Sequence, residues 1–152
     1  MKPILCQRSA EWKDKLLGSS KLKIGDYGCT STAIAEVNNL FGAECTPADV
    51  AAHKEWYTKD GLILWPKLNL QKANFIWRHY NFNPAIISQN ILDRDKAVLL
   101  EVNMPRANKH WLFAEAISDD GQIFARDPWT GYIVNVFQKY GAVTGFALFS
   151  RK

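Results

Sequence analysis

The sequence has few cysteines, no long apolar run and no linker. Its three cysteines, Cys6, Cys29 and Cys45, are an odd number without the spacing of metal ligands, which argues against a disulfide framework or a zinc site. No apolar stretch approaches the roughly 18 residues of a membrane-spanning helix, and no repeat or Pro/Gly/Ser-rich linker divides the chain. We therefore expect reduced thiols and one domain over residues 1–152, with no metal ion, no organic cofactor and no membrane span.

The composition is typical of a globular protein. Hydrophobic residues make up 47% of the chain and charged residues 22%, a balance that fits neither a disordered chain nor a membrane protein. The net charge of +4 comes from scattered Lys and Arg and is densest in KLLGSSKLK (15–23). We interpret this stretch as a solvated loop, with weak attraction to an anionic polymer such as nucleic acid or cell wall as the alternative. Since no nucleic-acid-binding motif is present, we expect no nucleic-acid partner.

Helical periodicity dominates the first half. A first helix is predicted up to Gly42 from apolar residues at helical spacing, namely Ala33, Ile34, Val37, Leu40 and Phe41. A second helix is predicted within TPADVAAHKEWYTKDG (46–61), with Thr46 as its N-cap. A third is expected within PKLNLQKANFIWRHY (66–80), after which Pro84 imposes an extended chain.

In the second half the apolar period changes to two. Turn residues separate five short segments rich in β-forming residues, which are 97–103, 110–118, 122–127, 132–137 and 145–150. Helices followed by strands predict an α+β domain in which N-terminal helices pack on a C-terminal antiparallel β-sheet.

Cys29 is the first candidate for chemistry. It lies at the head of the first predicted helix, where unpaired backbone N–H groups and the positive end of the helix dipole stabilise a thiolate over a thiol. That is the environment of a nucleophilic sulfur. The alternative is a small buried side chain, because free cysteines are among the most buried residues. A catalytic role therefore needs a base close to the sulfur.

His110 is the candidate base. It opens the strand HWLFAEA, where a cleft meets the core, whereas we interpret His53 and His79 as packing or surface residues. Asp127 ends the strand QIFARD, and counting outward from the turn at 119–121 brings it opposite His110 to within a residue or two. A carboxylate there orients the imidazole and stabilises its charged form. The alternatives are a structural histidine and a turn-forming aspartate.

Gln7 is the candidate for holding negative charge on oxygen. Its side-chain amide and the backbone N–H of Cys29 are suited to bind the oxyanion that develops when a thiolate attacks a carbonyl, and the alternative is an ordinary polar residue. The order Cys29, His110, Asp127 is that of papain-like enzymes, which keep a thiolate–imidazolium pair at neutral pH.

Several motifs together resemble one enzyme family. The chain is similar to the bacterial and phage branch of the papain-like cysteine peptidases, in cysteine peptidase family thirty-nine, which is related to the double-glycine leader peptidases. The segments that carry this resemblance are CQRSAEWKDKLLGSS, GDYGCTSTAIAEVNNLFG, TPADV, GLILWPKL, KHWLFAEAI and ARDPWTG, and they cover nearly the whole chain.

The resemblance implies a papain-like fold and a role for each candidate residue. It implies that the nucleophile, the general base and acid, the orienting residue and the oxyanion donor are Cys29, His110, Asp127 and Gln7. Leader peptidases carry Asp-Cys-Gly at the nucleophile with the glutamine close before it, whereas this chain has Tyr-Gly-Cys-Thr with Gln7 far upstream. The chain also has no transporter segment, so cleavage of double-glycine leaders is not implied.

We expect a cysteine peptidase or amidase acting on a peptide or a peptidoglycan-like substrate. Acyl transfer by the same residues, and an inactive binding module with the peptidase fold, are the alternatives. The candidate substrate-binding residues are Tyr27, Gly28, Trp111 and Trp129, with burial in the core as the alternative for the aromatic ones. The first residues lack the apolar core of a signal peptide, so we expect a cytoplasmic monomer that meets a cell wall only after lysis or with a phage.

Overall fold

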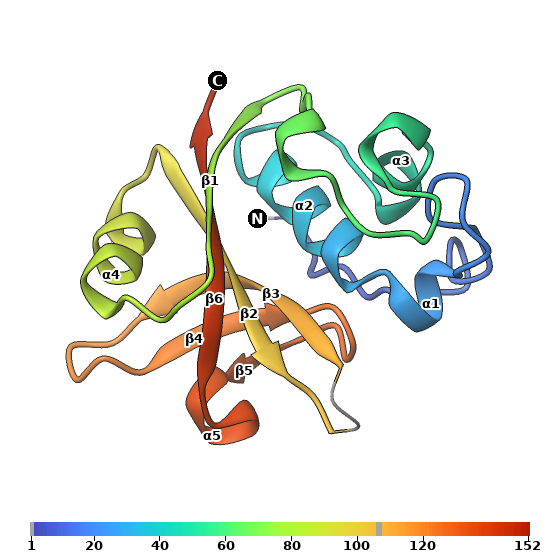
Figure 1. Ribbon diagram of the computed structural model, residues 1–152. Coiled ribbons are helices and arrows are strands. Elements are labelled where there is room, and N and C mark those ends of the chain that lie inside the picture. The colour runs from blue at the N-terminus through green and yellow to red at the C-terminus, as the bar shows by residue number, and fades with distance from the viewer. Residues whose placement is uncertain (1, 106–107) are drawn as a thin grey trace.

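A six-stranded sheet forms the middle of the protein, with helices on both faces (Figure 1). The computed structural model describes residues 2–105 and 108–152. The strand order is β1-β6-β2-β3-β4-β5, and every neighbouring pair is antiparallel. The strands are β1 (Ala73–His79), β2 (Lys96–Asn103), β3 (Lys109–Ile117), β4 (Ile123–Asp127), β5 (Tyr132–Asn135) and β6 (Val143–Arg151). The predicted α+β class and antiparallel sheet are confirmed.

The helices are distributed unequally around that sheet. One face carries α1 to α3, the other carries α4, and α5 lies at one end beside β4 and β5 (Figure 1). The α-helices are α1 (Ile24–Tyr27), α2 (Cys29–Leu40), α3 (Pro47–Ala51), α4 (Pro84–Leu92) and α5 (Val136–Tyr140). Short 3₁₀ turns follow α3 at Lys54–Trp56 and Trp65–Lys67.

Helix α2 packs on the sheet because its apolar residues fall on one side. Ala33, Ile34 and Val37 have no exposed surface, and each larger side chain of this kind contributes about 1.5–3 kcal/mol by burial. The helix begins at Cys29 and ends at Leu40, which confirms the first predicted helix. Its packing against β3 fixes the position of its first residue beside the sheet.

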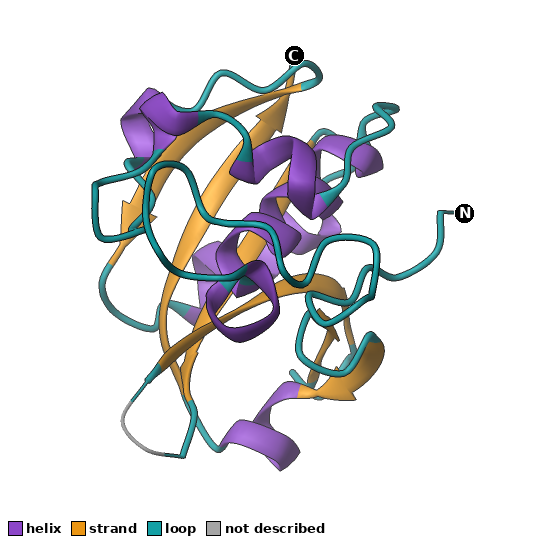
Figure 2. Ribbon diagram, turned by 90° about the vertical axis from the view of Figure 1, so that its right-hand side faces the viewer, coloured by secondary structure: helices purple, strands orange, loops and turns teal. Residues whose placement is uncertain are grey.

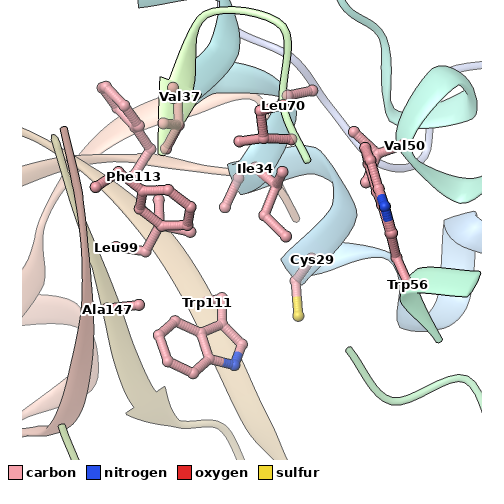
Figure 3. Packing of buried hydrophobic residues seen from close by; sticks show 14 of the residues in the cluster. Cys29, Ile34, Val37, Val50, Trp56, Leu70, Leu99, Trp111, Phe113 and Ala147 are labelled. Atoms are coloured by element: carbon pink, nitrogen blue, oxygen red, sulfur yellow. The ribbon is translucent and has the colours of Figure 1, made fainter. Parts of the chain in front are cut away.

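The strands divide their apolar side chains between two cores. In β2, Leu99 faces α2, whereas Val98 and Leu100 face α4, because successive side chains of a strand point to opposite faces. The core on the α2 side contains Ile34, Leu99 and Cys29 (Figure 3). A turned view shows the strong twist of the sheet between these two layers (Figure 2).

The second predicted helix is much shorter than the pattern indicates. Thr46 is the N-cap as predicted and forms a capping box with Asp49, but α3 ends at Ala51, and His53 has left the helical region with ψ at 86°. The chain turns because Tyr57 is buried against α2, where its hydroxyl lies 2.5 Å from Oγ of Ser31. That tertiary contact outweighs the helical preference of the segment.

The predicted third helix and the extended chain at Pro84 are both wrong. The segment from Ala73 to His79 forms β1, which pairs with β6 and is rich in the aromatic and β-branched residues that favour strands. Pro84 begins α4, because Asn83 caps the helix through a 3.1 Å bond from the Ile86 N–H and proline suits the first helical position.

The predicted strand at 132–137 is correct only in its first part. β5 ends at Asn135, whose side chain accepts a hydrogen bond from the N–H of Gln138 at 3.2 Å and so caps α5. The other four predicted strands are confirmed as β2, β3, β4 and β6, with ends that differ by one or two residues. Among these strands, the ends of β3 and β4 carry His110 and Asp127.

Candidate active site

Cys29 is the first residue of α2, directly after the turn from α1. At Gly28 a Cβ atom would lie 2.5 Å from the carbonyl oxygen of Ile24, so only glycine allows the two helices to follow each other so closely. Cys29 is 9% exposed, at the end of the row of core side chains (Figure 3). The sequence prediction that this cysteine heads a helix is confirmed.

Cys29 and His110 are close enough to shift each other's pKa. Burial raises the pKa of the Cys29 thiol, but the hydrogen bond and positive charge of His110, with smaller contributions from the Trp111 backbone and Thr30, lower it below its usual value. Burial lowers the pKa of His110, while interactions with Asp127 and Cys29 raise it to about 9. Both shifts favour the thiolate–imidazolium pair over the neutral pair near neutral pH.

Asp127 is the second partner of the His110 ring. Oδ1 of Asp127 lies 2.8 Å from Nε2 of His110, and both side chains are almost completely buried. Burial raises the pKa of the Asp127 carboxyl, yet the hydrogen bonds from His110, Tyr140 and Lys139 hold it well below its usual range. The carboxylate is therefore charged and fixes the imidazole with its other nitrogen free for the sulfur.

The register of two strands explains this contact. Phe113 of β3 pairs with Arg126 of β4, which places Asp127 next to the end of the ladder and near His110 on the same side of the hairpin. The register of the β3–β4 pair shifts between Ala114 and Ala116. Counting residues outward from the turn therefore does not give the exact partner of Asp127 on β3. The predicted contact between His110 and Asp127 is present in the structure.

Gln7 lies between the segments that carry Cys29 and Asp127. Its backbone N–H donates to the carbonyl of Pro128 at 2.8 Å, and its Nε2 donates to the carbonyls of Ile24 at 3.4 Å and Gly25 at 3.3 Å. Its Oε1 is buried, and among the described residues no atom forms a hydrogen bond with it. The amide nitrogen of the expected oxyanion donor is therefore engaged with α1 in this structure.

The candidate substrate-binding residues occupy different environments. Tyr27 is 55% exposed, whereas Trp111 is 7% exposed and belongs to the core, as the alternative interpretation expects. Trp129 is half-buried under the guanidinium of Arg8, and its backbone N–H donates to Oδ1 of Asp127 at 2.9 Å. Gly28 has the structural role of allowing the α1–α2 turn.

Two further residues of the site are not indicated by the sequence motifs described above. Nζ of Lys139 lies 2.9 Å and the hydroxyl of Tyr140 lies 2.5 Å from Oδ2 of Asp127. Both belong to α5, which the apolar alternation of residues 132–137 had concealed. The capping pattern of Asn135 and Gln138 was the signal for that helix.

The remaining cysteines and histidines lie outside this cluster. All three cysteines are free, and burial raises the pKa of Cys45 to about 11. His53 stacks on Trp56 and His79 on Phe146, which agrees with their interpretation as packing or surface residues.

No group of metal-ligating side chains occurs within residues 2–105 and 108–152. Within these same residues, every helix is too short or too polar to cross a membrane.

A separate cavity of about 620 Å³ lies at the other end of α2, where Leu40 and Glu36 are among its lining residues. Arg126 in its wall pairs with Glu36 at 2.8 Å and Glu115 at 2.6 Å. These ion pairs are internal and tie α2 to β3 and β4.

The chain was also compared with known proteins. No protein-family model, no curated protein and no solved structure was found to match it. What the protein does must therefore be inferred from the chemistry of the cluster of Cys29, His110 and Asp127.

Proposed function

We propose that this protein is a papain-like cysteine hydrolase that cleaves an amide or peptide bond. The observation that carries the proposal is the buried hydrogen bond of 2.8 Å between His110 and Asp127, beside a Cys29 thiol whose pKa His110 lowers. A nucleophile, a base and a group that orients the base are the three parts that activated-nucleophile catalysis requires. The order of these residues along the chain and the resemblance to cysteine peptidase family thirty-nine support the same assignment.

The first half of the reaction forms an acyl-enzyme. The Cys29 thiolate attacks the substrate carbonyl carbon, and the C=O electron pair moves onto oxygen. The C–N bond then breaks as the imidazolium of His110 passes its proton to the leaving amine. Throughout, Asp127 balances the charge on the imidazole.

The second half restores the enzyme. Neutral His110 takes a proton from water, the hydroxide attacks the thioester carbon, and the C–S bond breaks to release the acid and the Cys29 thiolate. The Cys29 backbone N–H and Gln7 are the proposed oxyanion donors. For Gln7 this role requires its Nε2 to leave the carbonyls of Ile24 and Gly25 when substrate binds.

A peptide or a peptidoglycan-like molecule is the proposed substrate. The net charge of +4 is consistent with an anionic cell-wall polymer. The bacterial or phage origin that we propose rests on the family resemblance alone. Tyr27, which is 55% exposed next to the α1–α2 turn, is the side chain best placed to contact an extended substrate near Cys29.

A second candidate is a binding module that has kept the peptidase architecture without turnover. The engagement of Gln7 Nε2 with two backbone carbonyls favours it, because the oxyanion donor is not free in this structure. The small exposed fraction of Cys29, 9%, points in the same direction.

Hydrolysis assays on peptide mixtures and on purified peptidoglycan distinguish these candidates. The wild type should release new amino groups, Cys29→Ala should release none, and the matched control Cys45→Ala should keep full activity. A Cys29→Ala protein as active as the wild type would contradict the proposal. Folded wild-type protein that binds a substrate without cleaving it would favour the binding module. An added amine trapped in the product would indicate acyl transfer.

A further inference from the structure

The Asp127 carboxylate is shared between two sets of donors. Oδ1 accepts from the His110 ring at 2.8 Å and from the backbone N–H of Trp129 at 2.9 Å. Oδ2 accepts from Nζ of Lys139 at 2.9 Å and from the hydroxyl of Tyr140. Because Asp127 itself has no exposed surface, these four donors replace the water that a carboxylate normally binds.

From this arrangement we propose that Lys139 and Tyr140 are positioning residues, and that Lys139 limits how strongly Asp127 retains the proton on His110. The catalytic role of these two residues rests on the proposed function. To that function it adds control of the pH range in which the protein is active. Neither residue touches the sulfur in the contacts described above. Lys139 acts through Asp127, and Tyr140 acts through Asp127 and the His110 ring.

The position of α5 explains why a five-residue helix can supply both donors to Oδ2 of Asp127. α5 follows β5 directly, and β5 pairs with β4 so that Tyr132 lies opposite Asp127. The helix is capped by Asn135 and ends at Tyr140, followed by Gly141 with φ at 83°. The ring of Tyr140 also lies 5.7 Å from the ring of His110, so it packs against the imidazole as well as bonding to its partner.

Charge explains the separate role of Lys139. A lone buried carboxylate next to His110 would favour the imidazolium strongly, because the two charges attract in surroundings with little water. The ammonium of Lys139 offsets part of the Asp127 charge from the opposite oxygen and repels the imidazolium. Since the Lys139 side chain is 37% exposed, solvent screens part of this effect.

Such a limit matters because His110 must both keep and release a proton. The imidazolium has to persist beside the thiolate and then protonate the leaving amine, and a proton held too tightly slows the second step. Within the described part of the chain, the titratable groups facing His110 and Asp127 are Cys29 of α2 and Lys139 and Tyr140 of α5. Lys139 is the cation among them that a substitution can remove without altering the triad.

An NMR titration of the His110 ring tests this directly and needs no substrate. The ring signal is identified by its absence from His110→Gln, and its midpoint is compared in the wild type, Lys139→Met, Lys139→Gln and Lys139→Arg. Loss of the ammonium should raise the midpoint by about half a unit or more, while Lys139→Arg should keep it near the wild-type value. Lys96→Met, which loses the same charge at the far end of β2, is the matched control.

The outcomes separate the two proposals. A midpoint that moves no more in Lys139→Met and Lys139→Gln than in Lys96→Met, or that moves to lower pH, would overturn the role of Lys139. If the midpoint of the His110 titration rises as expected but Cys29→Ala keeps the hydrolytic activity of the wild type, the proposed function fails. The effect of Lys139 on His110 then still stands. For Tyr140, Tyr140→Phe should broaden the His110 signal or shift it, and an unchanged signal would limit Tyr140 to packing.

Discussion

His110 and Asp127 form a direct hydrogen bond, 2.8 Å from Nε2 to Oδ1, in a part of the protein where neither side chain is exposed to water. A bond between a buried base and a buried carboxylate fixes the ring and its charge at once. Burying such charged groups is costly unless hydrogen-bond donors and opposite charges take the place of water. The four donors around Asp127 provide that set.

Removal of the Asp127 carboxylate should strongly impair catalysis. Asp127→Ala should lower kcat/KM by about 10²–10⁴-fold, because His110 loses the group that orients its ring and stabilises its charged form. The measurement is the rate of hydrolysis on whichever substrate the wild type cleaves. Asp95→Ala removes an exposed carboxylate that pairs with Arg151 and is the control. Equal losses in both variants would mean that Asp127 has no special role.

Asp127 should also make the fold sensitive to acid. Its pKa is depressed in the folded protein, so its contribution to stability is present above its unfolded pKa of about 3.9 and is lost as pH falls toward the folded value. The free energy of unfolding in urea, measured from about pH 5 to pH 2, should therefore fall more steeply in the wild type than in Asp127→Asn. Parallel curves for the two proteins would contradict this contribution.

Gly28 should be intolerant of any side chain. The Cβ atom of alanine at this position would lie 2.5 Å from the Ile24 carbonyl oxygen and 2.6 Å from the Ile24 side chain. Gly28→Ala should therefore destabilise the protein by about 1–3 kcal/mol or more, measured by urea unfolding, and should slow the reaction of Cys29 with alkylating agents. A variant with wild-type stability would show that the α1–α2 turn relaxes easily.

The strands and the core of the site follow from local pattern, and this is why they were predictable. The alternation in 110–118 and 122–127, with a turn between them, is enough to bring His110 and Asp127 together. Similarly, the apolar spacing after Cys29 defines α2. In each case the signal lies in a short stretch of sequence and agrees with the fold around it.

Other features depend on contacts between distant segments. Residues 73–79 form a strand because β6 is available to pair with them, and the shortening of α3 depends on the burial of Tyr57 near Ser31. Lys139 and Tyr140 reach Asp127 only because β5 ends one residue before α5 begins. No periodicity within a single segment contains that information.

The thiolate–imidazolium pair can be tested by the pH dependence of alkylation at Cys29, followed by mass spectrometry in the wild type and in His110→Ala. At about pH 6, Cys29 should react at least about tenfold faster than Cys45, whose pKa is raised to about 11, because the imidazolium of His110 holds Cys29 as a thiolate. In His110→Ala the alkylation of Cys29 at this pH should slow by at least about tenfold, although Cys29 stays at the head of α2. If Cys29 reacts no faster than Cys45 in the wild type, or equally fast with and without His110, the paired thiolate and imidazolium do not exist.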